Sequence, residues 1–303
     1  MSGVELPRLL NAATAFVDVH IEQGRGDKVA ILCDDQAITY RKLQENVNRF
    51  GNALLRMDAR IEERVAMLLP VTPEWAYVFF GSMKIGAVAV PLNTNLGPTD
   101  YHYFLNDSRS RILVVHESLL DRITEISGEL KYLKYILVVG DQSHGHDTLT
   151  GALDEASPEL EAAETNKDDA AFWLYSSGTT GSPKGTIHLH HDMIVEADLY
   201  AQDTIGLRES DVSFSVAKLF FAFGLGNGLY FPLRVGGTTI LLPDRPTPKA
   251  VFEIIERHQP TVFYSVPTSY AALLHEAEES ECTNLGRLRM CVSAGETLPK
   301  HLF

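Results

Sequence analysis

The sequence predicts an α/β fold in which mostly parallel strands form a sheet covered by helices on both faces. Short apolar runs rich in Val, Ile and Leu alternate with segments of helical periodicity along most of the 303 residues. The runs are continuously apolar, which is typical of strands buried on both faces. Glycine or proline closes several of them, as expected where a strand or helix ends.

The first 65 residues predict a hairpin followed by a helix. Residues 29–32 are expected to form a strand, residues 34–36 a turn, and residues 38–40 the partner strand. Thr39 is a candidate N-cap for the helix. Apolar residues then recur at helical spacing at Tyr40, Leu43, Val47, Phe50, Leu54 and Leu55.

Two strand–helix–strand units are predicted between residues 64 and 140. Pro70 closes the first apolar run, and Gly86 closes the helix after it. The expected strands are residues 65–69, 87–92, 111–115 and 135–139, and the expected helices cover about 75–85 and 100–106. Residues 141–169 are polar, acidic and rich in turn residues, so a solvated connection is expected there.

A second α/β series begins near residue 212, after a helix expected over about 192–204. It alternates strands and helices like the first series. The expected strands are residues 212–216, 238–242, 261–266 and 289–293, and the expected helices cover about 247–258 and 269–279.

Composition excludes several classes of protein. The net charge of −14 argues against a nucleic acid or an anionic membrane as the main partner. No apolar run reaches the roughly 18 residues that a membrane span needs. The N-terminal residues lack the pattern of a signal peptide. Cys33, Cys282 and Cys291 are too few and too irregularly spaced for a disulfide framework or a zinc site, so we expect a cytoplasmic protein.

Residues 175–186 (YSSGTTGSPKGT) are the strongest functional signal. Small residues let backbone N–H groups converge on a ligand, hydroxyls add donors, and Lys184 adds a positive charge. A polyphosphate suits such a stretch, and a solvent-facing linker is the alternative. The stretch is not a Walker A loop, because Pro183 precedes the lysine and Gly185 follows it. Proline also predicts that the chain stays a loop through Lys184.

Two further stretches suggest a ligand site. In residues 218–228 (KLFFAFGLGNG), phenylalanines alternate with small residues, which can form a slot for a planar ring; a buried core corner is the alternative. Residues 293–299 (SAGETLP) follow the last expected strand, where open α/β sheets place ligands. The histidines at 188, 190 and 191 show no further ligand spacing, so we expect no metal site from them.

These stretches resemble the signatures of the adenylate-forming enzymes, the acyl-CoA synthetase/AMP-binding superfamily. Residues 175–186 resemble its phosphate loop, residues 84–93 (KIGAVAVPLN) its early signature, and residues 293–299 its adenine-side segment. Within the group, three segments together resemble the benzoate–CoA ligase family. They are residues 218–227, 245–248 (RPTP) and 264–270 (YSVPTSY).

The resemblance implies an incomplete enzyme. Family members continue past residue 303 with a magnesium-binding glutamate, a ribose-binding aspartate and a small C-terminal domain carrying the adenylation lysine. We therefore expect an N-terminal fragment that lacks full activity alone. Its expected fold is a set of stacked αβα subdomains, incomplete at the C-terminal side. Residues 66–204 would carry the phosphate loop, and residues 10–65 with 205–303 the aryl pocket.

The activity that the resemblance implies for the intact enzyme is ligation of an aryl acid to coenzyme A, an acid–thiol ligation. Benzoate, or a substituted benzoate such as 4-hydroxybenzoate, would be activated by ATP and Mg²⁺ through an acyl-adenylate and passed to CoA. The implied catalytic residues are Thr179, Thr180 and Lys184, with Thr180 also a magnesium ligand. The implied ATP-binding residues are Ser176, Ser177, Gly178, Thr179, Thr180, Gly181, Lys184, Ser293, Ala294, Gly295, Glu296 and Thr297. The implied aryl-acid residues are Phe221, Ala222, Phe223, Gly224 and Tyr264.

Two other functions stay open from the sequence. The chain could be a remnant that binds a nucleotide or an aryl acid without turnover. It could also belong to an aryl-adenylating enzyme that loads a carrier protein. The association state is open as well, and a homodimer is one of the states allowed.

Overall fold

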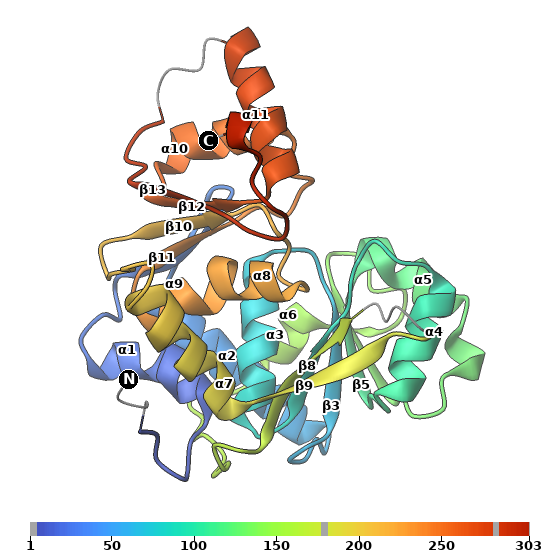
Figure 1. The fold of residues 1–303 in the computed structure, drawn as a ribbon. Coiled ribbons are helices and arrows are strands. Elements are labelled where there is room, and N and C mark those ends of the chain that lie inside the picture. The colour runs from blue at the N-terminus through green and yellow to red at the C-terminus, as the bar shows by residue number, and fades with distance from the viewer. Residues whose placement is uncertain (1–4, 177–180, 281–284, 303) are drawn as a thin grey trace. The chain divides into compact units, whose positions relative to one another are not determined.

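The computed structural model describes residues 5–176, 181–280 and 285–302, which form two compact units (Figure 1). The first unit comprises Met1–Asp27 and Tyr40–Glu196. The second comprises Lys28–Thr39 and Ala197–Phe303. Each unit has its own sheet, so the predicted α/β fold is confirmed.

The division of the early chain differs from the expected grouping of residues 10–65 with 205–303. Only residues 28–39 join the later part of the chain. The reason is strand pairing: β1 (Val29–Cys33) runs parallel to β11 (Thr238–Leu241). The helix that follows instead packs on a helix of the first unit.

The sheet of the first unit is mixed. Its described strands lie in the order β7-β6-β5-β3-β4-β8-β9, all parallel except the antiparallel pair β8 and β9. Their bounds are β3 (Arg64–Leu68), β4 (Val88–Pro91), β5 (Ile112–His116), β6 (Tyr135–Val139), β7 (Asp147–Thr148), β8 (Ala170–Ser176) and β9 (Lys184–Leu189).

Helices cover both faces of this sheet (Figure 1). On one face, α4 and α5 enclose a core that includes Ala66, Leu113 and Phe104. On the other, α2 packs along α3. The bounds are η1 (Thr14–Asp18), α1 (Val19–Glu22), α2 (Tyr40–Arg56), α3 (Pro73–Lys84), α4 (Pro98–Asp107), η2 (Glu117–Leu119), α5 (Leu120–Thr124), η3 (Ser127–Glu129), α6 (Leu149–Asp154) and α7 (His190–Glu196).

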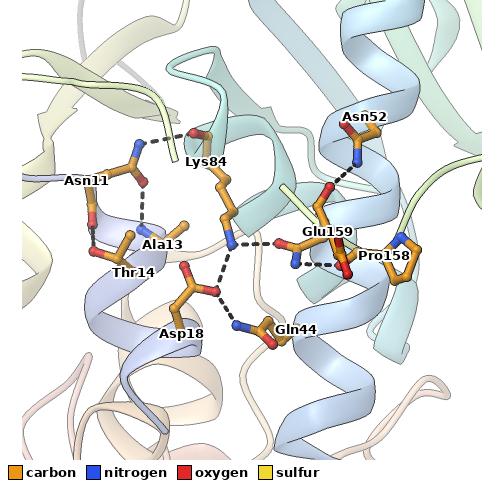
Figure 2. A network of polar contacts seen from close by, with 10 residues as sticks. Asn11, Ala13, Thr14, Asp18, Gln44, Asn52, Lys84, Pro158 and Glu159 are labelled. Carbon is orange, nitrogen blue, oxygen red and sulfur yellow. Dashed lines mark hydrogen bonds and ion pairs between the residues drawn. The ribbon is translucent and has the colours of Figure 1, made fainter. Parts of the chain in front are cut away.

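A buried ionic network joins η1, α2 and α3. Lys84, the last residue of α3, is 2% exposed, and its ammonium group lies 2.7 Å from Asp18 Oδ1 (Figure 2). The same ammonium donates to Asn48 Oδ1, and Gln44 donates to Asp18. A buried charge requires such partners, because water is absent to solvate it.

Helix α2 also fixes the segment that follows α6. Arg49 donates to the carbonyl oxygens of Leu153 and Ala156, and Arg56 to those of Ala152 and Glu155. These carbonyls belong to the last turn of α6 and to the two residues after it, where carbonyls have no partner within the helix. The residues expected to form a solvated connection therefore contain a short helix, with Leu149 buried.

The sheet of the second unit is mixed as well. Its described strands lie in the order β13-β12-β10-β11-β1-β2, parallel except for the hairpin of β1 and β2. The remaining bounds are β2 (Gln36–Thr39), β10 (Val212–Ser215), β12 (Val262–Ser265) and β13 (Met290–Ser293).

Different helices cover the two faces of the second sheet (Figure 1). Helices α10 and α11 cover a core containing Phe214, Ile240 and Phe263. On the other face, Thr239 Oγ1 donates to the carbonyl of Gly228 in η5 at 2.7 Å. The bounds are η4 (Ala197–Gln202), α8 (Ala222–Leu225), η5 (Gly226–Tyr230), α9 (Phe231–Arg234), α10 (Pro248–His258), α11 (Pro267–Ser280) and η6 (Lys300–Leu302).

Two local expectations were wrong. The chain does not stay a loop through Lys184, because β9 begins there and Lys184 pairs with Ser176. The helix expected over about 192–204 begins earlier, at His190, and passes from α7 into the π-helical segment η4.

Candidate functional site

The first candidate region is the connection between β8 and β9. These antiparallel strands pair as far as Ser176 and Lys184, so the described residues of the Ser/Thr/Gly-rich stretch 175–186 lie on and between the two arms of a β-hairpin. Ser177, Gly178, Thr179 and Thr180 lie outside the described residues.

The described side chains of this hairpin suit an anionic ligand. Ser176, Gly181 and Lys184 are exposed, and a Cβ built at Gly181 would meet no atom within 4 Å. No ion pair of Lys184 is found within the described parts of the chain. An exposed ammonium beside open backbone can approach phosphate oxygens.

Helix α4 contacts both ends of the hairpin. Tyr175 Oη donates to Asp107 Oδ2 at 2.7 Å, and Tyr103 Oη donates to the carbonyl of Pro183 at 2.8 Å. Burial raises the pKa of Tyr175, and the Asp107 carboxylate raises it further, so the phenol keeps its proton. No motif in the sequence marks Tyr103 or Asp107, because they lie 80 and 68 residues from their partners.

The second candidate region is the aromatic segment formed by Phe221 and the first three residues of α8. Phe221 is 49% exposed, Ala222 is exposed, Phe223 is partly buried and Gly224 is buried. A Cβ at Gly224 would lie 2.2 Å from the carbonyl oxygen of Lys218, so only glycine fits there. Four of the five expected aryl residues thus lie at the start of α8.

Tyr264, the fifth expected aryl residue, is fully buried in β12. It pairs in register with Ser215 of β10. Burial raises the pKa of its phenol. Tyr264 therefore has no exposed surface in this structure, unlike Phe221.

Lys218 links the aromatic segment to the end of β11. Its ammonium donates to the carbonyl oxygens of Leu242 at 2.7 Å and Pro243 at 3.0 Å, and also to that of Asp244. Burial lowers its pKa to about 8, while Asp244 acts in the opposite direction. The ammonium is thus engaged with backbone carbonyls, which is a structural role that the sequence did not reveal.

The third candidate region follows β13. Ser293 ends that strand and pairs with Ser265, and its Oγ is buried. Ala294 is partly buried, whereas Gly295, Glu296 and Thr297 are exposed. A turn at the carboxyl end of a parallel strand is a common ligand position.

The three histidines at 188, 190 and 191 have separate contacts. The His188 ring stacks on Phe172 with centroids 4.5 Å apart, and buried His190 Nδ1 accepts from the N–H of Ala12. His191 Nδ1 lies 3.1 Å from Asp168 Oδ1. Across the described parts of the chain, no group of three or more His, Cys, Asp or Glu residues could hold a metal ion. No described helix is long and apolar enough to cross a membrane.

Comparison with known proteins gives consistent matches. The model of the AMP-binding enzyme family matches residues 18–303. The chain is 44% identical over 301 residues to the benzoate–CoA ligase of Thauera aromatica, covering 98% of this chain and 56% of that protein. It is 43% identical over 289 residues to the 4-hydroxybenzoate–CoA/benzoate–CoA ligase of Rhodopseudomonas palustris, covering 95% and 53%. The chain therefore spans about half the length of the curated relatives it matches.

Comparison with solved structures also matches CoA ligases. An anthranilate CoA ligase in complex with anthranoyl-AMP matches with a TM-score of 0.95 and 39% identity, covering 100% of this chain and 58% of that one. A benzoate CoA ligase from Burkholderia xenovorans LB400 matches with a TM-score of 0.87 and 39% identity, covering 97% and 57%.

Proposed function

Because this chain belongs to the AMP-binding enzyme family, we propose that the intact protein joins an aromatic carboxylic acid to coenzyme A at the expense of ATP. The observation that carries the proposal is the 44% identity with a benzoate–CoA ligase over 98% of the chain. We propose benzoate or a ring-hydroxylated benzoate as the acid. A cytoplasmic location and a homodimer are further expectations for the intact protein.

A carboxylate is a poor acyl donor because oxide would have to leave. The proposed reaction avoids this by activating the carboxylate in two steps. A carboxylate oxygen attacks the α-phosphorus of ATP, so that pyrophosphate leaves and an acyl-adenylate forms. The CoA thiol then attacks the acyl carbon, loses its proton and displaces AMP. The first step brings two anions together, so positioning and preorganised donors carry most of the catalysis.

We assign phosphate binding to the hairpin. Its N–H groups and hydroxyls, in residues 176–181, would bind the β- and γ-phosphates, and Lys184 would add a positive charge. The exposed Lys184 and the open space at Gly181 fit this role. We assign Thr179 and Thr180 to the reacting phosphates. The Thr180 hydroxyl is also the oxygen ligand that this chain would contribute to Mg²⁺.

We assign acid binding to the second unit. Phe221, Ala222, Phe223 and Gly224 would border the aryl ring, and the exposed face of Phe221 supports this. Buried Tyr264 would support the slot from β12. Residues 293–297 would border the adenine and the acyl group.

Pyrophosphate release by the intact protein tests the proposal. We expect release that depends on ATP, Mg²⁺ and an aryl acid, with benzoate and 4-hydroxybenzoate compared at equal concentration. Gly178→Val should lower the rate severely, because a side chain would obstruct the phosphates. An unchanged rate in this variant would overturn the phosphate assignment.

The same assay separates the alternatives. Omission of CoA should block thioester formation while a single turnover of acyl-adenylate remains. Isothermal titration that shows ATP–Mg²⁺ binding without pyrophosphate release would favour a binding remnant. Release that requires a carrier protein in place of CoA would favour a carrier-loading enzyme.

A further inference from the structure

One helix, α4, holds both ends of the phosphate hairpin by a hydrogen bond at each end. Tyr175, bonded to Asp107, stands one residue before β8 ends at Ser176. Pro183, bonded to Tyr103, stands one residue before β9 begins at Lys184. We infer that Tyr103 and Asp107 are positioning residues that set where the hairpin presents its donors to the nucleotide. This inference rests on the proposed function.

The two tyrosines that donate these hydrogen bonds are held firmly, because their rings pack in a core. The rings of Tyr103 and Tyr175 meet edge to face with centroids 6.4 Å apart. Phe104, on the same helix, lies 4.5 Å from the Tyr175 ring, centroid to centroid. Both tyrosines pack against the core cluster of the first unit. A tyrosine has only two rotatable side-chain angles, so its hydroxyl is well fixed once the ring is packed.

The position of Asp107 supports a specific role. It is the last residue of α4, where a carboxylate is unfavourable because the carbonyl ends of the helix already carry partial negative charge. A hydrogen bond from a hydroxyl to a carboxylate is stronger than one between neutral groups. The bond from Tyr175 therefore offsets an otherwise unfavourable placement.

The contact at Pro183 compensates for a weak strand end. Among the described strands, β9 pairs only with β8, at the edge of the sheet. Its early residues Thr186 and Ile187 are exposed, so few side chains hold this strand in place. Proline has no N–H, which leaves its carbonyl as the backbone group that can be held. Tyr103 supplies that bond.

Tyr103→Phe and Tyr101→Phe form a matched pair for testing this inference in the intact protein. Tyr101 lies on the same helix and donates to the carbonyl of Asn93 at 2.9 Å, away from the hairpin. We expect Tyr103→Phe to raise KM for ATP about fivefold, the effect of losing one hydrogen bond of about 1 kcal/mol, with KM for the aryl acid unchanged. Tyr101→Phe should leave KM for ATP unchanged.

Asp107→Ala and Asp107→Asn form a second pair. The asparagine amide oxygen can still accept the bond from Tyr175, whereas alanine cannot. We expect Asp107→Ala to raise KM for ATP and Asp107→Asn to restore most of the loss. Equal effects of the two variants would contradict a role through the Tyr175 hydroxyl.

Hydrogen–deuterium exchange gives a readout that needs no activity. Peptides covering residues 181–187 should exchange faster in Tyr103→Phe than in wild type, and Tyr101→Phe should match wild type. Exchange in Tyr103→Phe that equals that of Tyr101→Phe would overturn the anchor. Faster exchange with an unchanged KM for ATP in an active enzyme would overturn the positioning role. Wild-type protein without aryl-acid-dependent pyrophosphate release would instead refute the proposed function.

Discussion

The ammonium group of Lys84 and the carboxylate of Asp18 form an ion pair, 2.7 Å long, in which Lys84 is 2% and Asp18 14% exposed (Figure 2). It joins the end of α3 to the end of η1, and Asn48 of α2 completes the shell. Residue 84 opens the segment 84–93, which resembles an early signature of the family. In this structure the lysine of that segment has a structural role.

Loss of this pair should destabilise the first unit strongly. Lys84→Met leaves the Asp18 carboxylate buried without its cation, which costs about 3–5 kcal/mol. Urea unfolding followed by tryptophan fluorescence measures the change, because both tryptophans, Trp75 and Trp173, belong to this unit. Lys42→Met is the control, since its pair with Glu45 is exposed and contributes at most about 1 kcal/mol. Equal losses in the two variants would contradict the prediction.

A methyl group at position 224 should disrupt the aromatic segment. Gly224→Ala would place a Cβ 2.2 Å from the Lys218 carbonyl oxygen and 2.6 Å from that of Ala217. Such overpacking against backbone costs about 1–3 kcal/mol or more and displaces α8. The midpoint temperature of thermal unfolding and KM for the aryl acid should both change. Gly128→Ala, at a site where a Cβ meets no atom within 4 Å, should change neither.

Acid should destabilise the first unit through His190. Burial lowers the pKa of this histidine to about 4, against 6.5 for an exposed one, with Asp169 acting in the opposite direction. The unfolded chain therefore binds a proton between pH 6.5 and 4 that the folded chain does not bind. Stability from this group is complete above pH 6.5 and falls by about 2 kcal/mol between pH 7 and pH 5.

His190→Gln should flatten this pH dependence, because glutamine keeps an acceptor for the N–H of Ala12 and does not titrate. Urea unfolding at pH 5 and pH 7 measures it. His102→Gln is the control, since His102 is partly exposed and lies 3.5 Å from Glu129. If the difference in unfolding free energy between pH 7 and pH 5 were the same in His190→Gln as in wild type, the prediction would be refuted.

Phe223 should influence the choice of acid if it borders the ring as proposed. Phe223→Tyr adds a hydroxyl that takes space near the ring of the bound acid. We therefore expect the ratio of kcat/KM for 4-hydroxybenzoate to kcat/KM for benzoate to fall about tenfold. Phe252→Tyr, the same change on α10, should leave this ratio unchanged. Identical ratios in Phe223→Tyr and wild type would contradict the assignment of Phe223 to the acid site.

The sequence predicted the elements whose signal is local. Continuous apolar runs located strands such as β3 and β6 to within a residue or two, and Gly86 stands just after the end of α3, as expected. The helix α6 escaped prediction because Arg49 and Arg56, about 100 residues away, supply the donors that hold its end. No local pattern reports such partners.

The candidate site shows the same limit. Its small residues, phenylalanines and lysine were visible as motifs in single stretches. The contacts of Tyr103, Asp107 and Lys218 were not visible, because each of these side chains bonds to a backbone carbonyl or a hydroxyl elsewhere in the chain. Such contacts depend on the fold and leave no periodicity or spacing in the sequence.

The hairpin of β1 and β2 extends the sheet of the second unit at one edge, although it is synthesised long before the other strands of that sheet. Thr238 Oγ1 donates to the carbonyl of Val29, a contact that spans 209 residues. At ribosomal speeds, about 10–40 s separate the emergence of these two residues. The hairpin therefore emerges long before β11 and must expose an unpaired strand edge while the intervening chain folds. Nascent chains of this protein should be most vulnerable to aggregation, and most in need of a chaperone, during that interval.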